Sequence, residues 1–216
     1  MLPPGYLGGL YRTGNDFSER PVEIIAPDIE RGKELKIHVP VEDYRVLEQG
    51  SVWPDIYTSL VKLIREHRST LVFENDRATA ERVAANVNAI ADEELCRPHH
   101  GSISRNRRLE TEERFKAGKL RCIIATSTLE LGIDVGSVDF IVQVSAPPAV
   151  SAGLQRLGRA GHRLSAVSKG VIIPKTRVDL VKSCFIAKEM LDARIEKERI
   201  PENCLDILAQ HIVSKC

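Results

Sequence analysis

Residues 70–90 read TLVFENDRATAERVAANVNAI, and this stretch shows the repeating unit from which the fold is built. Its first four residues are an apolar run of strand length that ends where polar residues begin at Glu74. The apolar residues that follow recur at helical spacing, and Ala80, Val83 and Val87 fall on one face. The stretch therefore predicts a short buried strand followed by an amphipathic helix, which is half of a βαβ unit.

The same alternation continues on both sides of this stretch. We expect further strands at residues 36–41, 122–125, 138–144 and 170–173. Further helices are expected from Pro54 onward and over residues 104–117, 150–157 and 177–193, with Ser104 as an N-cap and Gly118 at a C-cap. Short apolar strands that alternate with longer helices predict an α/β fold with a doubly wound parallel sheet and helices on both faces.

Three segments are expected along the chain. Residues 1–35 are rich in Gly, Pro and charge and read as a connector with one short strand at residues 22–26. Residues 36–200 carry the regular pattern and form the globular domain. In residues 201–216, Leu205, Leu208 and Ile212 have helical spacing, which predicts the opening helix of a further, truncated domain.

The basic charge is concentrated locally, although the formal net charge of the chain is only +1. Residues 97–121 hold eight basic and three acidic residues, and residues 154–182 hold seven basic residues and one acid, Asp179. A balanced total argues against a globally basic nucleic-acid binder, while these two stretches suit phosphate contacts. The plainer alternative is that they are solvated helix faces.

The cysteines and the apolar runs indicate the cellular context. Five cysteines, widely spaced and never in a C-x-x-C pair, are typical of reduced thiols rather than of a disulfide framework. No apolar run approaches the length of a membrane span, and the first residues lack the features of a signal peptide. We therefore expect a cytoplasmic protein that does not contact the membrane.

Two glycine-bearing polar segments lie near the carboxyl ends of predicted strands, where open parallel sheets place their ligand sites. The first directly follows the strand at residues 122–125, and the second belongs to the helix that the loop at residues 145–148 leads into. Residues 126–134 read TSTLELGID, and residues 155–163 read QRLGRAGHR. Polar residues also follow the strand at residues 70–73. No G-x-x-x-x-G-K-[S/T] phosphate loop is present in the sequence. The two segments resemble the paired sites with which a nucleic-acid-dependent ATPase senses nucleotide and strand, and without a phosphate loop the chain looks like half of such a motor.

At these residues the chain resembles the C-terminal RecA-like lobe of superfamily 2 helicases, and among them most of all the large helicase-related (Lhr) family. The resemblance runs from Gly8 to Val213. Residues 71–77 are similar to motif IV, 99–102 to a strand-contact motif, 126–134 to motif V and 155–163 to motif VI. Four motifs in the correct order and spacing make the resemblance specific, and it implies a RecA-like sheet.

The resemblance implies roles around a nucleotide. Gly132 and Asp134 match positions near the nucleotide sugar and the attacking water. Arg159 matches the arginine that reaches the γ-phosphate, where planar donors neutralise the charge that develops during phosphoryl transfer. His162 stands where a second arginine is usual, so Arg163 is the candidate for that role. The implied catalytic set is Asp134, Gln155, Arg159 and Arg163, and the implied ATP-binding set is Gly132, Asp134, Arg156, Arg159 and Arg163.

The resemblance also implies a nucleic-acid interface. Thr126 matches a position that holds a strand phosphate, while Gln155 and Arg156 match residues that couple the nucleotide cleft to the strand. Gly101 and Ser102 precede a predicted helix and can offer backbone N–H groups to a phosphate. The implied strand-binding set is Asn75, Arg77, His100, Gly101, Ser102, Arg105 and Thr126.

Some of these residues also have plainer explanations. Asp134 could be a turn-forming aspartate, and Trp53 is expected to pack rather than to stack on bases. Cys96, His99 and His100 could form half a zinc site, but no second ligand pair has suitable spacing, so no metal site is expected. The acidic residues 92–94 imitate a magnesium motif, yet they follow a predicted helix rather than a strand.

The sequence as a whole predicts the second motor lobe of an ATP-dependent, Lhr-type helicase. Its implied partners are single-stranded DNA or a DNA–RNA hybrid, a first RecA-like lobe and downstream winged-helix-type domains. Its implied cofactors are ATP and Mg²⁺, held mainly by the first lobe. The alternative is a free-standing or truncated nucleic-acid-binding or docking module without ATPase activity. A Rossmann-type enzyme does not fit, because no G-x-G-x-x-G follows an early strand.

Overall fold

The computed structural model describes residues 10–14, 16–21, 23, 32–47, 50–126, 136, 138–161, 167–196 and 204–214. The chain divides into two compact units. One comprises Met1–Ile29 with Glu196–Cys216, and it holds an antiparallel hairpin of β1 (Leu10–Thr13) and β2 (Asp16–Glu19) together with helix α7 (Leu205–Val213). The other unit, Glu30–Ile195, is the α/β lobe that carries the candidate site.

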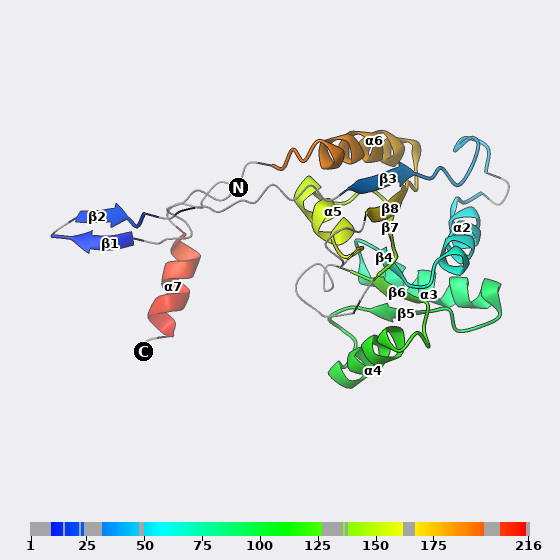
Figure 1. Ribbon diagram of the computed structural model, residues 1–216, viewed down its shortest axis with the longest axis horizontal. Helices are drawn as coiled ribbons and strands as arrows, with labels where there is room; N and C mark the ends of the chain where they lie inside the picture. The colour runs from blue at the N-terminus through cyan, green and yellow to red at the C-terminus, as the bar shows by residue number, and fades with distance from the viewer. Residues whose placement is uncertain are drawn as a thin grey trace. The chain divides into compact units, whose positions relative to one another are not determined.

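The lobe is built on a six-stranded parallel sheet in the order β3-β8-β7-β4-β6-β5 (Figure 1). The strands are β3 (Lys33–Ile37), β4 (Thr70–Phe73), β5 (Cys96–His99), β6 (Cys122–Ala125), β7 (Phe140–Val144) and β8 (Ser168–Ile173). The helices are α2 (Trp53–Glu66), α3 (Arg77–Ala91), α4 (Arg105–Lys116), α5 (Val150–Leu157) and α6 (Arg177–Leu191). The predicted doubly wound α/β fold with a parallel sheet and helices on both faces is confirmed.

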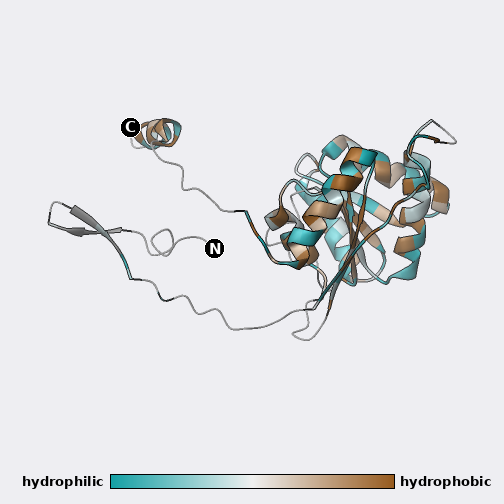
Figure 2. Cartoon of the chain, turned by 90° about the horizontal axis from the view of Figure 1, so that it is seen from above, coloured by the Kyte–Doolittle hydropathy of each residue, from teal (hydrophilic) through white to brown (hydrophobic). Residues whose placement is uncertain are grey.

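Two apolar layers cover the two faces of the sheet. On one face, α2 and α3 pack on alternate strand residues such as Val72 and Val142. On the other face, residues of α4, α5 and α6 pack on the intervening strand residues, which include Phe73 and Ile141. Figure 2 shows hydrophobic and hydrophilic residues alternating around these helices, as expected when one face of each helix lies on a sheet.

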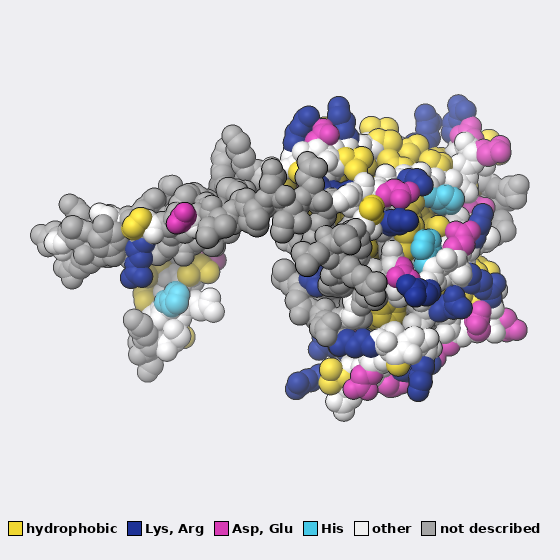
Figure 3. Space-filling model, in the orientation of Figure 1, with side chains coloured by type: hydrophobic (Ala, Val, Ile, Leu, Met, Phe, Trp, Pro, Cys, Tyr) yellow, Lys and Arg dark blue, Asp and Glu magenta, His cyan; other side chains and the backbone are white. Residues whose placement is uncertain are grey.

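The outward face of α6 is an exception to the polar surface. Val178, Val181 and Phe185 are between 65% and 80% exposed, and hydrophobic side chains are visible over this helix in Figure 3. Their spacing of three and four residues puts them on one side of the helix.

Three strand predictions need correction. The first strand of the lobe spans Lys33–Ile37 and not residues 36–41, because its register with β8 begins at Lys33. Strand β5 was not predicted, since Arg97 and Pro98 interrupt its apolar pattern; as an edge strand it tolerates a proline. The hairpin of β1 and β2 was also missed. The strand predicted at residues 22–26 lies outside the described residues except for Glu23, which is not in a strand.

The ends of α4 confirm one capping prediction and correct another. Ser104 holds the N-cap position, but its side chain makes no capping hydrogen bond. Gly118 has a φ of 69°, and its N–H donates to the Phe115 carbonyl while the Lys119 N–H donates to the Arg114 carbonyl. This paired pattern with a left-handed glycine is a Schellman motif, which ends the helix.

Helix α5 lies close to the sheet because a glycine faces it. A Cβ on Gly170 of β8 would lie 2.9 Å from Cδ1 of Leu157 and 3.0 Å from the Ile141 carbonyl oxygen. A larger residue there would push the end of α5 outward, and the segment that carries Arg159 follows that end directly.

No helix among the described residues is both long enough and apolar enough to span a membrane.

Candidate functional site

The loops that follow β4 and β5 meet at the carboxyl edge of the sheet. Nη1 of Arg77 donates to Oγ of Ser102 at 2.8 Å, and both residues are exposed. Asp76 caps α3 by accepting a hydrogen bond from the Thr79 N–H at 2.7 Å. The cap fixes where α3 begins, so Arg77 leaves the sheet edge in a defined direction. Two residues predicted to contact a strand are thus brought together.

The two histidines of the β5 loop are buried and paired with acids. His99 is fully buried, and its Nε2 lies 2.9 Å from Oε1 of Glu112. His100 is 5% exposed, and its Nε2 lies 2.7 Å from Oε1 of Glu81. These contacts hold the loop, so that Gly101 and Ser102 are the exposed residues of the motif.

The zinc alternative for this loop finds no geometric support. Sγ of Cys96 lies against Asn88 and the Ala84 carbonyl, away from the partners of His99 and His100. Within the described ranges there is no group of three His, Cys, Asp or Glu side chains that could hold a metal ion.

Arg156 of α5 is a buried arginine, so the alternative of a solvated helix face does not hold at this position. It is 2% exposed, its guanidinium lies 5.3 Å from the centre of the Phe73 ring, and its Nη1 donates to Oδ1 of Asn75 at 3.2 Å. Nδ2 of Asn75 in turn donates to the Ala146 carbonyl at 3.2 Å. One residue of the predicted nucleotide motif therefore contacts one residue of the predicted strand motif.

Asp179, the only acid between residues 154 and 182, binds backbone amides. Its carboxylate accepts from the Ala146 N–H at 3.0 Å and from the Lys175 N–H at 2.8 Å. It thereby joins the loops after β7 and β8 to the first turn of α6. The Asp179 carboxylate therefore holds these loops in place at the carboxyl edge of the sheet.

Of the remaining residues predicted to bind nucleotide or strand, some lie in the described part of the chain and some do not. Thr126 is buried, and its N–H donates to the His99 carbonyl at 3.4 Å. Gln155 is exposed and Arg159 is half-buried just beyond α5. Gly132, Asp134 and Arg163 lie outside the described residues.

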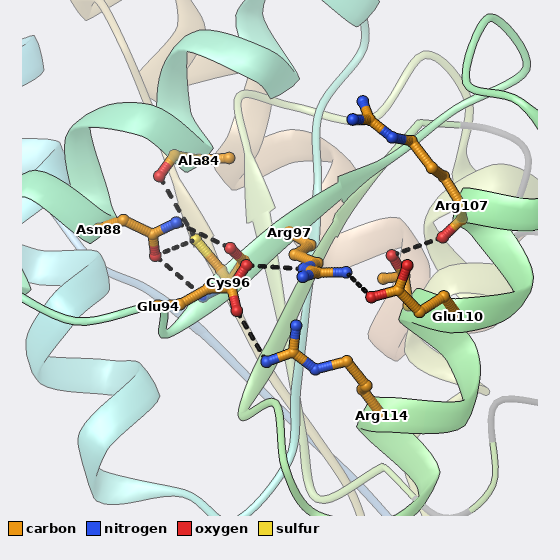
Figure 4. Close-up of polar contacts among 9 residues, drawn as sticks. Ala84, Asn88, Glu94, Cys96, Arg97, Arg107, Glu110 and Arg114 are labelled. Carbon is orange, nitrogen blue, oxygen red and sulfur yellow. Dashed lines mark hydrogen bonds and ion pairs between the residues drawn. The ribbon is translucent and has the colours of Figure 1, made fainter.

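Some of the basic side chains in residues 97–121 form ion pairs with acids of this region, which neutralise part of its positive charge (Figure 4). Arg97 contacts Glu94 and Glu110 at 2.7 Å each, and Arg114 contacts the second oxygen of Glu94 at 2.7 Å. Hydrogen bonds from Arg97, and then from Arg114, hold the pKa of Glu94 below its usual range. The network fixes α4 against edge strand β5 beside a groove of about 420 Å³. Exposed Arg105 and Arg107 lie on the first turn of the same helix.

The acidic residues that imitate a magnesium motif are confirmed as the end of a helix. Asp92 is the left-handed C-cap of α3, and Glu93 pairs with Arg65 at 2.9 Å.

The family model of the helicase conserved C-terminal domain matches residues 55–163, which is half of the chain. The chain belongs to this family. The matched range contains the predicted motifs IV and V and all of motif VI.

Two relatives of this helicase domain are Lhr-type proteins. It is 38% identical over 229 residues to the Lhr helicase/probable uracil glycosylase of Mycolicibacterium smegmatis, which covers 91% of the chain and 15% of that protein. It is 44% identical over 188 residues to the ATP-dependent helicase Lhr-Core of Methanocaldococcus jannaschii, covering 86% and 22%. The domain is a C-terminal superfamily 2 lobe of the Lhr family.

A solved structure shares the fold of the helicase domain. Mycobacterium smegmatis Lhr bound to ssDNA and AMP-PNP matches with a TM-score of 0.86 and 44% identity over 90% of this chain and 26% of that one. The chain spans 15% to 24% of the length of its curated Lhr relatives.

One residue of the helicase domain was missed by sequence reasoning. Glu74 directly follows β4 and is fully buried, and neither carboxylate oxygen has a hydrogen-bond partner among the described residues. Burial raises the pKa of Glu74 to about 8, against the opposing effect of Lys175, whose Nζ lies 3.8 Å from Oε2. The sequence signal for Glu74 is an acid directly after an apolar strand. Taken by itself, that signal marks the end of the strand and does not indicate a buried carboxyl group.

Proposed function

We propose that this chain is the second motor lobe of an ATP-dependent nucleic-acid helicase. A first lobe would supply the phosphate-loop lysine and the acids that hold Mg²⁺. This lobe would close on the nucleotide and hold the strand, so that ATP binding and hydrolysis move the strand. The observation that carries the proposal is the hydrogen bond between Arg156 and Asn75, which joins the nucleotide motif to the strand motif.

On the nucleotide side, Arg159 is proposed to reach the γ-phosphate across the cleft. Its half-buried position just beyond α5, with its N–H bonded to the Arg156 carbonyl at 3.1 Å, supports a defined backbone path for that segment. Arg163 is proposed as the second donor, with Gly132 and Asp134 near the sugar and the attacking water. Gln155 is proposed to couple the nucleotide cleft to the strand.

On the strand side, the contact between Arg77 and Ser102 supports a continuous interface along the carboxyl edge. Arg77 and Arg105 would supply charge, and the backbone of Gly101 and Ser102 would approach phosphates closely. His100 and Thr126, both buried, would hold the loops in place. The full proposed set is Asn75, Arg77, His100, Gly101, Ser102, Arg105 and Thr126.

The proposed strand is single-stranded DNA or a DNA–RNA hybrid in a cytoplasmic protein. The ssDNA in the structure of the mycobacterial relative supports the first of these. We further propose that residues 1–35 connect to the first lobe, that residues 36–200 form the helicase domain, and that residues 201–216 open a following domain of winged-helix type.

The proposal predicts that the chain alone neither binds ATP tightly nor hydrolyses it. Turnover of ATP by the purified chain, with and without oligonucleotide, is the measurement. Strand-stimulated turnover would contradict the motor-lobe proposal, because the lobe would then be catalytically complete. Strand binding without turnover is shared with the alternative of a docking or binding module.

A substitution in the joined motor separates these two functions. In a protein that links this chain to a first lobe, Arg159→Ala should lower the strand-stimulated turnover number by about 10³-fold or more, because one charge donor to the transition state is lost. Strand affinity should stay unchanged. Arg68→Ala is the matched control, since Arg68 is 92% exposed and pairs with Asp139 at the amino-terminal end of β4. Wild-type turnover by the Arg159 variant would contradict the assigned role and favour the binding module.

A further inference from the structure

Four side chains from separate segments form a cluster at the carboxyl edge of the sheet. They are Trp53 at the start of α2, Glu74 after β4, Arg82 on α3 and Lys175 after β8. The Arg82 guanidinium carbon lies 4.5 Å from the centre of the Trp53 ring, and Nζ of Lys175 lies 5.6 Å from it. Tyr57 stacks with the same ring at 5.6 Å. The aromatic ring thus gathers two cations that are far apart in the sequence.

Glu74 makes this cluster more than a packing arrangement. Its side chain is fully buried, and neither oxygen has a hydrogen-bond partner of good geometry among the described residues, although the Asn75 N–H acts to lower its pKa. Its ion-pair partner is Lys175 at 3.8 Å. A buried carboxylate without donors is costly, and a distance of 3.8 Å is an ion pair without a hydrogen bond. The 3.8 Å contact with Lys175 therefore leaves the Glu74 carboxyl without a hydrogen-bonded partner among the described residues.

The two cations remain accessible to a ligand. The Lys175 side chain is 25% exposed, and Arg82 is exposed. Asp76 lies nearby, but one of its oxygens already accepts from the Thr79 N–H. Lys175 also has its backbone fixed through Asp179. A pair of cations held on an aromatic ring suits an oxyanion with several acceptor oxygens.

We propose that Lys175 and Arg82 bind a backbone phosphate of the nucleic-acid strand. The buried Glu74, when ionised, competes with that phosphate for the positive charge of Lys175. This inference rests on the proposed function, because it extends the strand interface from the neighbouring Asn75 and Arg77. It adds a contact outside the four sequence motifs.

The arrangement makes strand binding sensitive to pH. Lys175, Asp76, Arg82 and Tyr57 are the charged and titratable groups that face Glu74. Because burial raises the pKa of Glu74 to about 8, the carboxyl is mostly neutral below that pH and charged above it. The neutral form leaves the charge of Lys175 available, so a phosphate binds more tightly at the lower pH.

The test is the affinity of the whole chain for a short fluorescent oligo(dT), measured by anisotropy at low salt on both sides of about pH 8. The wild-type affinity should fall about tenfold as Glu74 ionises. Glu74→Gln should keep the affinity of the lower pH and lose this dependence. Lys175→Met should weaken binding at the lower pH and reduce the slope of log affinity against log salt by about 0.7, as expected for one lost phosphate contact.

Matched variants separate the loss of a specific phosphate contact from a general loss of positive charge or of folding. Lys169→Met removes an exposed lysine at the opposite end of β8 and should leave the affinity unchanged. Lys175→Arg keeps the charge and should restore binding. Unchanged circular dichroism spectra show that each variant is folded.

The outcomes distinguish this inference from the proposed function. If Arg77→Ala weakens strand binding and Lys175→Met does not, the proposed phosphate contact of Lys175 is contradicted, while the strand interface of the proposed function is supported. If the wild-type chain binds no strand at low salt, both proposals are contradicted. If Lys175→Met weakens binding of a fluorescent ATP analogue but not of the strand, the phosphate belongs to the nucleotide and the inference fails.

Discussion

Glu74 should determine much of the pH dependence of stability. Its pKa is raised from an ordinary value of 4.5 to about 8, so the folded state holds a proton that the unfolded chain releases. The stability linked to this proton is fully present below pH 4.5 and is lost as the pH rises through about 8, by up to about 5 kcal/mol. Glu74→Gln, which has no charge to bury, should flatten this dependence in urea titrations made at a series of pH values.

The control for that series is Glu93→Gln, because Glu93 is an exposed acid in an ion pair with Arg65. It should follow the wild-type dependence closely. A Glu74→Gln profile that keeps the full wild-type slope would mean that the acid is not a buried titrating group.

Two single residues show that sequence patterns do not predict the burial of a charged side chain. Arg156 is a charged residue in a short helix and Glu74 follows an apolar strand, yet both are buried. Their burial depends on Phe73, Asn75 and Lys175, which come from other segments of the chain. Contacts between distant segments have no local signature, so neither environment could be predicted from spacing.

At the scale of elements, the end of α4 allows a clean test of backbone strain. Gly118 has a φ of 69°, and a Cβ placed there would meet nothing within 4 Å. Gly118→Ala should therefore lower the free energy of unfolding by about 1 kcal/mol through the left-handed conformation alone. Gly118→Asn should cost clearly less, since asparagine tolerates that conformation. Equal losses for both variants in urea denaturation would point to a packing effect instead.

Elements were predicted best where their pattern is apolar. The runs at residues 70–73 and 122–125 are central strands, buried on both faces, and their composition shows it. Strand β5 is an edge strand whose Arg97 is engaged by acids of two other segments, so its strand character depends on partners. The ends of elements depend on register, which explains the shifted bounds of β3.

At the scale of the molecule, alternation of strands and helices was sufficient for the fold class but not for the strand order. The order β3-β8-β7-β4-β6-β5 puts the first strand beside the last, a pairing that no local pattern encodes. The same order brings the loops after β4, β8 and β7 into one neighbourhood. The cluster around Trp53 is a product of that topology.

The compact unit Glu30–Ile195 should fold without the rest of the chain. Among the described residues, every buried member of the two hydrophobic clusters lies between Val52 and Met190, the partly buried residues packed against them begin at Leu35, and α7 has no buried residue. A fragment of residues 30–195 should therefore show the same urea midpoint and nearly the same denaturant dependence as the whole chain, because that dependence scales with the surface exposed on unfolding. A fragment that begins at residue 38 is the control: it lacks β3, which pairs with β8, and should be less stable. A lower midpoint for residues 30–195 would mean that the terminal segments stabilise the lobe, and strand affinity would then have to be measured only on the whole chain.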